Sequence, residues 1–282
     1  MPEVPKRYIR LVVADKNGLA FEIDQAFDIT ATVSRSKKRD PDTADIAVYN
    51  LKKDMRHFIG TDAVAVELYA GTKQPANMIF KGEIIDGVSV RSDEDNFVDW
   101  ITTIDAEDTK SKLRTTIVSR TYNAGTKLYA ALYDLAAAAE TQITISISDR
   151  ALPSAMSFVG RPRDCIAKML ERFGARYQII HGRMLIVDED VPTTSNIPLI
   201  NKHTGLIGVP NVKKEKGVVK VGFKTQLNQE LFPGGLCHLE TSSVESGRVA
   251  QLKQSTSYWI DRVDHVVESR GEFFSECECR EV

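Results

Sequence analysis

The sequence contains no long apolar run. No segment of the 282 residues approaches the roughly 18 consecutive apolar residues that a membrane-spanning helix needs. The first ten residues, MPEVPKRYIR, also lack the apolar stretch that is typical of a secretory signal peptide. We therefore expect no membrane-spanning segment and a protein that is made, and at first kept, in the cytoplasm of its host.

Cysteine is scarce, with four residues, and the spacing matches neither a disulfide framework nor a zinc site. Cys277 and Cys279 would share one face of a strand, at a Cα separation of about 6.6 Å that is awkward for a disulfide bond. Cys237 and His238 are neighbours on another expected strand, so they point to opposite faces. Cys165 falls on the apolar stripe of an expected helix. We interpret the cysteines as core residues, with a ligand pair at Cys277 and Cys279 as the alternative.

Motifs of nucleotide binding and hydrolysis are also missing. The chain has no G-x-x-x-x-G-K-[ST] loop, dinucleotide fingerprint, H-E-x-x-H motif or G-x-S-x-G elbow. Gly205 to Gly208 predicts a backbone bend beside a strand. Asp93 to Asp95 and Asp188 to Asp190 leave open glycoside hydrolysis by paired acids, but both clusters are expected in exposed loops, without the burial that raises a catalytic pKa. We predict no enzyme activity and no catalytic, cofactor-binding or metal-binding residues.

The overall charge is nearly balanced, with 37 basic and 39 acidic side chains and a formal net charge of −2. A dedicated nucleic-acid-binding protein would usually carry a basic excess. The charges are unevenly placed, since Asp93 to Asp108 includes seven carboxylates and no lysine or arginine, whereas Lys202 to Lys224 includes six lysines and one glutamate. Opposite patches suit a protein that meets partners of both signs; the alternative is two solvated faces that contact nothing.

Apolar and polar residues alternate from Tyr8 to Glu107, which is typical of half-buried antiparallel strands. In the clearest run, Phe27 to Ser34, every second residue is apolar. Only Lys52 to Ile59 predicts a short helix. Residues 1–108 are therefore predicted to form a first β-barrel domain.

The pattern then changes to helical spacing. Leu128 to Ala139 predicts an alanine-rich helix, and Pro162 to Phe173 predicts a second one with a proline in its first turn. Arg176 to Val187 predicts a hairpin around a tight His-Gly turn. Residues 109–190 are predicted to form a small α+β domain.

Alternation returns after Val191 to Pro198, a polar segment with two prolines that predicts a linker. Residues 191–282 are predicted to form a second all-β domain, so the fold class is mainly β with a smaller α+β domain. Its strands are expected at Val219 to Phe223, Leu236 to Glu240, Arg248 to Lys253, Ser257 to Val267 and Phe273 to Arg280.

Five stretches resemble, in order and spacing, the baseplate hub proteins of phage tails. Departures exist, since Thr72 stands where the family often has tyrosine after Ala-Gly, and Val221 to Lys224 replaces a more leucine-rich run. The central domain matches mainly in pattern. The stretches are TADIAVYNLKKDMRHFI (Thr43 to Ile59), VAVELYAGTKQPANMIFKGEI (Val64 to Ile84), TGLIGVPNV (Thr204 to Val212), VVKVGFKTQLNQELFPGGLCHLET (Val218 to Thr241) and SYWIDRVDHVVESRGEFFSECECREV (Ser257 to Val282).

The resemblance implies a structural virion protein of the tail baseplate. Each chain would contain two tail-tube-like antiparallel β-barrels flanking the α+β insert, and a homotrimer would form a pseudo-sixfold ring with a channel. The expected partners are other copies of the chain, a tail tube or tube-initiator protein, the central spike protein and the tape measure protein, with DNA passing only transiently.

Three alternatives stay open. A tail-associated hydrolase would act on peptidoglycan or polysaccharide. A carbohydrate-binding tail module should show exposed aromatic platforms, although aromatic residues are only 7% of this chain. A distal tail or tube-initiator protein would form rings of six copies rather than three.

Overall fold

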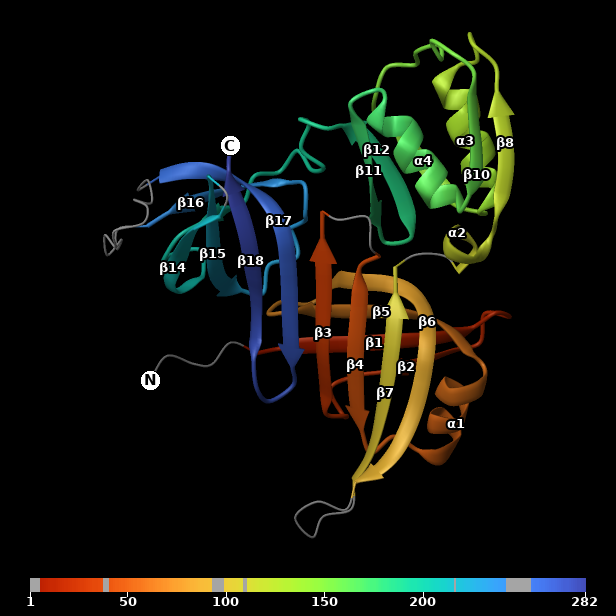
Figure 1. Ribbon diagram of the computed structural model, residues 1–282. Coiled ribbons are helices and arrows are strands. Elements are labelled where there is room, and N and C mark those ends of the chain that lie inside the picture. Colours follow the sequence, from red (N-terminus) through yellow and green to blue (C-terminus); the bar gives the residue numbers. More distant parts are fainter. Residues whose placement is uncertain (1–5, 38–40, 93–98, 109–110, 216, 242–254) are drawn as a thin grey trace. The chain divides into compact units, whose positions relative to one another are not determined.

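The computed structural model describes residues 6–37, 41–92, 99–108, 111–215, 217–241 and 255–282. The chain divides into two compact units, one made of Met1–Glu107 with Thr194–Val282 and the other of Asp108–Thr193. Strands dominate (Figure 1), and the predicted fold class, mainly β with a smaller α+β part, is confirmed. The three-domain division at residues 108 and 190 stays a prediction. The strand expected at residues 248–253 lies outside the described residues.

The first β module is the part of the larger unit before residue 108. Its strands pair in the order β3-β4-β7-β6-β5-β1-β2, and every pair is antiparallel. The elements are β1 (Tyr8–Asp15), β2 (Ala20–Ile23), β3 (Ile29–Ser36), β4 (Thr43–Tyr49), α1 (Lys53–Thr61), β5 (Ala63–Gly71), β6 (Asn77–Ser92) and β7 (Asp99–Glu107).

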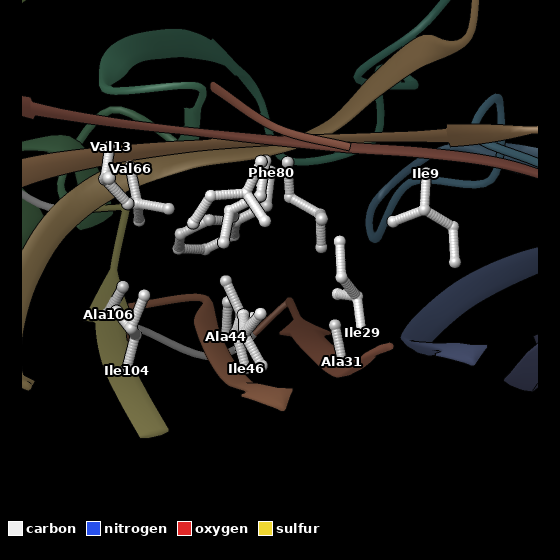
Figure 2. Close-up of a cluster of buried hydrophobic side chains, with 14 of the residues drawn as sticks. Ile9, Val13, Ile29, Ala31, Ala44, Ile46, Val66, Phe80, Ile104 and Ala106 are labelled. Atoms are coloured by element: carbon white, nitrogen blue, oxygen red, sulfur yellow. The ribbon is translucent and has the colours of Figure 1, made fainter. Parts of the chain in front are cut away.

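Two layers of this module enclose its core. Strand β6 belongs to both, because its first half pairs with β5 and its second half with β7. Figure 2 shows the side chains of Ile9, Val66 and Phe80 pointing toward those of Ile46 and Ile104 across the core. Burial of alternate residues on facing strands explains the apolar periodicity of the sequence.

The second β module is the rest of the larger unit. Its strands pair in the order β14-β15-β18-β17, and β17 also pairs with β16, which β13 joins in parallel. Its core includes side chains from β13, β16 and the longer strands. The elements are β13 (Leu199–Ile200), β14 (Leu206–Glu215), β15 (Val218–Gln226), β16 (Leu236–Glu240), β17 (Ser255–Glu268) and β18 (Phe273–Glu281).

A ladder between β3 and β17 joins the two modules. It is antiparallel and runs over seven residue pairs, from Ser36 opposite Arg262 to Thr30 opposite Glu268. In Figure 1, β18, β17, β3, β4 and β7 lie side by side in this layer. Each module thus contributes four strands to one eight-stranded antiparallel sheet, β14-β15-β18-β17-β3-β4-β7-β6.

The smaller unit is an α+β domain. Helices α3 and α4 and the β11–β12 hairpin confirm the predicted elements, and the residues of the hairpin turn, His181 and Gly182, both have positive φ, at 50° and 77°, as a type I′ turn requires. The sequence did not predict α2 or the β8–β10 ribbon. The elements are α2 (Ser111–Thr115), β8 (Val118–Tyr122), α3 (Leu128–Ala138), β9 (Gln142–Ile145), β10 (Met156–Gly160), α4 (Pro162–Glu171), β11 (Ala175–Ile180) and β12 (Arg183–Asp188).

Among the described residues, no helix is both long enough and apolar enough to cross a membrane.

Candidate assembly surface

The eight-stranded sheet has one apolar face and one polar face. The apolar face lies against the two cores, where β1, β5 and α1 pack in the first module and β13 and β16 in the second. We call the opposite face the outer face. Many of its side chains are exposed and charged, as the alternation of the strands dictates. They include Asp45, Asp86, Asp105, Lys213, Lys220, Lys224, Glu276 and Glu278.

In the part of the chain that the structure describes, both ends of this sheet are edges without a further strand partner, although α1 packs against β6 at Gly87. At one end, the second half of β6 pairs only with β7, and at the other end β14 pairs only with β15. Large apolar side chains on these two strands are between 44% and 65% exposed: Ile85, Val88 and Val90 on β6, and Ile207 and Val209 on β14. An exposed apolar edge strand is a template for pairing with another strand.

The two open edges run in opposite directions. Every neighbouring pair in the eight-stranded sheet is antiparallel, so the first and last of an even number of strands are antiparallel too. The β6 edge of one copy can therefore continue into the β14 edge of another as an antiparallel pair. Repeated head to tail, such a contact either closes a ring or extends a filament.

A buried ion pair lies at the seam between the modules. Arg35 of β3 is 3% exposed and Asp42 is 6% exposed, with 3.6 Å between Arg35 Nε and Asp42 Oδ2. Arg35 Nη2 donates a hydrogen bond to the Ile79 carbonyl oxygen of β6. The Arg35 guanidinium also lies 4.4 Å from the ring centroid of Phe232, which belongs to the second module. One side chain thus holds together two layers of the first module and a loop of the second.

Two titratable groups of the seam have shifted pKa values. Burial raises the pKa of Asp42 to about 7, although the charge of Arg35 opposes the shift. Burial, and then the charge of Arg35, hold the pKa of His265 on β17 well below its usual 6.5. His265 Nδ1 lies 2.8 Å from the Ser275 hydroxyl, which also accepts a hydrogen bond from the Asn228 backbone N–H. His265 therefore stays neutral inside the folded unit.

These shifts predict opposite pH dependences for two variants. A raised carboxyl pKa stabilises the fold at low pH and loses that contribution as the pH rises through about 7, whereas a lowered histidine pKa stabilises it above 6.5 and loses that contribution as the pH falls. Asp42→Asn removes the carboxyl contribution, so its free energy of unfolding, relative to that of the wild-type chain, should fall as the pH falls below about 7, by at most about 1.4 kcal/mol per pH unit.

His265→Gln removes the histidine contribution, so its free energy of unfolding, relative to that of the wild-type chain, should instead rise as the pH falls below 6.5. Urea denaturation at a series of pH values measures both slopes. Slopes of the same sign in the two variants would contradict the assignment.

The thiols that the sequence placed in the core are buried. Cys277 and Cys279 lie on the same side of β18, and Cys237 of β16 faces Cys279 with 3.9 Å between the two sulfur atoms. Burial raises the pKa values of Cys277 and Cys279 well above the ordinary thiol value. His238 points to the other face of β16, with Nδ1 3.1 Å from the Ser257 hydroxyl.

Of the two carboxylate clusters, the structure describes only Asp188 to Asp190. Asp93 to Asp95 lie outside the described residues. Asp188 ends β12 in the smaller unit, 3.9 Å from Arg150 Nη2, and Glu189 and Asp190 are exposed. In the described part of the chain, no three His, Cys, Asp or Glu side chains are grouped as metal ligands.

The glycines of the predicted bend, Gly205 and Gly208, have positive φ of 111° and 70°. They flank the start of β14, whose register against β15 shifts between Ile207 and Asn211. The bend beside a strand is confirmed.

The sequence analysis did not predict the buried pair of Arg35 and Asp42. Arg35 continues the inward phase of Ile29, Ala31 and Val33, and a charged residue at an apolar position of a strand is the signal that could have revealed it.

No protein-family model and no curated protein sequence matches the chain. Solved structures do match it. The 43 kDa tail protein of prophage MuSo2 from Shewanella oneidensis superposes with a TM-score of 0.68 at 9% identity, over 98% of both chains. A tail protein from Neisseria meningitidis MC58 gives a TM-score of 0.67 at 8% identity, over 98% of this chain and 96% of that one.

The fold also occurs outside phages. An E. coli component of the type VI secretion system, described as structurally similar to the T4 tail proteins gp27 and gp5, gives a TM-score of 0.62 at 8% identity over 91% of this chain and 74% of that one. At such identities the likeness concerns the fold alone. The chain has the fold of phage tail proteins, and the resemblance read from its sequence is confirmed at that level.

Proposed function

We propose that the protein is a non-enzymatic structural component of a phage-type tail, a baseplate hub whose three copies close into a ring around a channel. The observation that carries the proposal is the eight-stranded sheet, which has open antiparallel edges at both ends in a chain with the fold of tail proteins. Head-to-tail pairing of β6 with β14 would satisfy both edges, because a closed ring leaves no edge.

The division of strands between the modules supports three copies. Four strands come from each module, so one chain supplies two similar sectors and three chains supply six. A threefold ring of this kind can contact a sixfold tail tube on one side and a threefold spike on the other.

The layers of the sheet support one assignment of the face that would line the channel. The apolar face carries further strands and α1, and these additional layers fit only on the convex outside of a ring. The outer face of the sheet, which is exposed and carries charged side chains together with Val88 and Val90 of β6, would then line the channel. Its mixed charges suit transient passage of DNA, because a uniformly basic wall would retain a polyanion.

The same proposal includes where the protein would act. It would be assembled in the host cytoplasm and would reside in the tail baseplate of the virion, between the tail tube or tube-initiator protein and the central spike protein, with the tape measure protein reaching the same channel.

Native mass spectrometry of the purified chain tests the ring. We expect a species of three times the 31.4 kDa chain mass and threefold rings with a central hole in electron micrographs. A chain that stays monomeric at every concentration would contradict the proposal. Rings of six copies would instead indicate a tube-type tail protein, and release of sugar from peptidoglycan or polysaccharide would indicate a hydrolase.

A further inference from the structure

Three aspartates lie next to one another on the outer face of the first module. Asp45 of β4 is opposite Asp105 of β7, and Asp105 is opposite Asp86 of β6. All three are exposed. Partial burial and the charge of Asp105 raise the pKa of Asp45, as expected when like charges share one row. We call these three residues the acidic row.

Three cations form a matching row in the second module. Lys213 of β14 is opposite Lys220 of β15, and Lys220 is opposite Arg280 of β18. Within the chain, Arg280 also forms an ion pair with Asp261, with 3.2 Å between Nε and Oδ1. We call Lys213, Lys220 and Arg280 the basic row.

Like charges lie opposite one another within each row, and in the basic row Asp261 offsets part of the charge of Arg280 and Lys220. Side chains directly opposite one another on paired strands have Cβ atoms about 4.5–5.5 Å apart, and like charges in that position destabilise the pair. Each row also reaches an open edge of the sheet, because Asp86 lies on β6 and Lys213 on β14. A strand added at either edge would lie about 4.8 Å away, close enough for its charges to offset those of the row.

We propose that the acidic row of one copy and the basic row of the next hold the joint between β6 and β14, so that the partner of each open edge is a second copy of this chain. The inference rests on the ring proposed above. It adds that the charges of the two rows determine which edges of neighbouring copies pair. Charge complementarity supports it, since joining two β6 edges would bring two acidic rows together and joining two β14 edges two basic rows. The rows therefore favour head-to-tail pairing over both symmetric alternatives.

Charge reversal at the two edge residues tests the joint. We expect Asp86→Lys and Lys213→Glu each to weaken ring formation about tenfold or more, measured as the concentration at which native mass spectra lose the multi-chain species. The double variant, D86K with K213E, should restore assembly to near the wild-type level, because every joint again joins opposite charges. Lys168→Glu, at an exposed position of α4, makes the same charge change as Lys213→Glu in the smaller unit, which supplies no strand to the eight-stranded sheet, and should leave assembly unchanged.

Failure of this inference is distinct from failure of the ring. If the wild-type chain forms rings and the single reversals assemble equally well, or if both singles fail and the double variant is not rescued, the charged rows do not hold the joint although the ring stands. If the wild-type chain forms no ring, the proposed function fails and the inference fails with it. Circular dichroism of each variant verifies that its fold is intact.

Discussion

Replacing Gly82 with alanine should destabilise the first β module by about 3 kcal/mol or more, and replacing it with valine should prevent the module from folding. Gly82 lies where β6 passes from its pairing with β5 to its pairing with β7. A Cβ atom there would collide with the Glu107 carbonyl oxygen, and would lie 2.6 Å from the Glu107 carbonyl carbon and 2.8 Å from Phe80 Cζ. Two of these three atoms are backbone and cannot rotate away.

Gly222→Ala provides the matched control. Gly222 also lies inside a paired strand, β15, but a Cβ atom there would meet its nearest neighbour, the Cys277 carbonyl oxygen, at an ordinary 3.8 Å. Alanine should therefore change the free energy of unfolding by less than about 1 kcal/mol. Urea denaturation of both variants measures the difference. An equal loss of stability at the two glycines would show that the close backbone approach at Gly82 does not explain why glycine is needed there.

The change of pairing partner along β6 at Gly82 illustrates what the sequence could and could not predict. Alternation identified most strands of the larger unit and the side chains that face its cores, because burial on one face imposes a period of two. Alternation does not say which strand lies beside which. The residues paired between β3 and β17 are more than 200 positions apart in the sequence, so this ladder had no local signal. The pairing of β6 with β5 in one layer and with β7 in the other had none either.

The charged surface was predictable only in part. The acidic stretch from Asp93 to Asp108 and the basic stretch from Lys202 to Lys224 are visible in the sequence. The acidic row, however, combines Asp105 with Asp45 and Asp86, which lie outside that stretch, and the basic row adds Arg280 from the last strand. Rows are properties of strand pairing and register, so composition can indicate the sign of a surface but not its members.

Breaking the buried ion pair at the seam should have the second large effect. Arg35→Met removes the hydrogen bond to the Ile79 carbonyl oxygen and the cation beside Phe232, and leaves the buried Asp42 without its cation. Removing one partner of a buried pair costs about 3–5 kcal/mol, because the remaining charge stays desolvated. We expect a loss of up to that size in the free energy of unfolding by urea denaturation, smaller near neutral pH and larger at higher pH, because the charge of Arg35 lowers the pKa of Asp42 and the carboxyl protonates more readily without it.

Two further variants separate the buried charge from general damage to the seam. Replacing both partners, with Arg35→Met and Asp42→Leu in one chain, should recover most of the loss, because no ion is then left desolvated. Arg270→Met removes an arginine whose side chain is 86% exposed and lies 3.9 Å from Asp28, and it should cost less than about 1 kcal/mol. If the double variant were as unstable as Arg35→Met, packing of the Arg35 side chain rather than its charge would account for the cost. An intact double variant that no longer formed rings would show that Arg35 sets the geometry between the two modules as well as their stability.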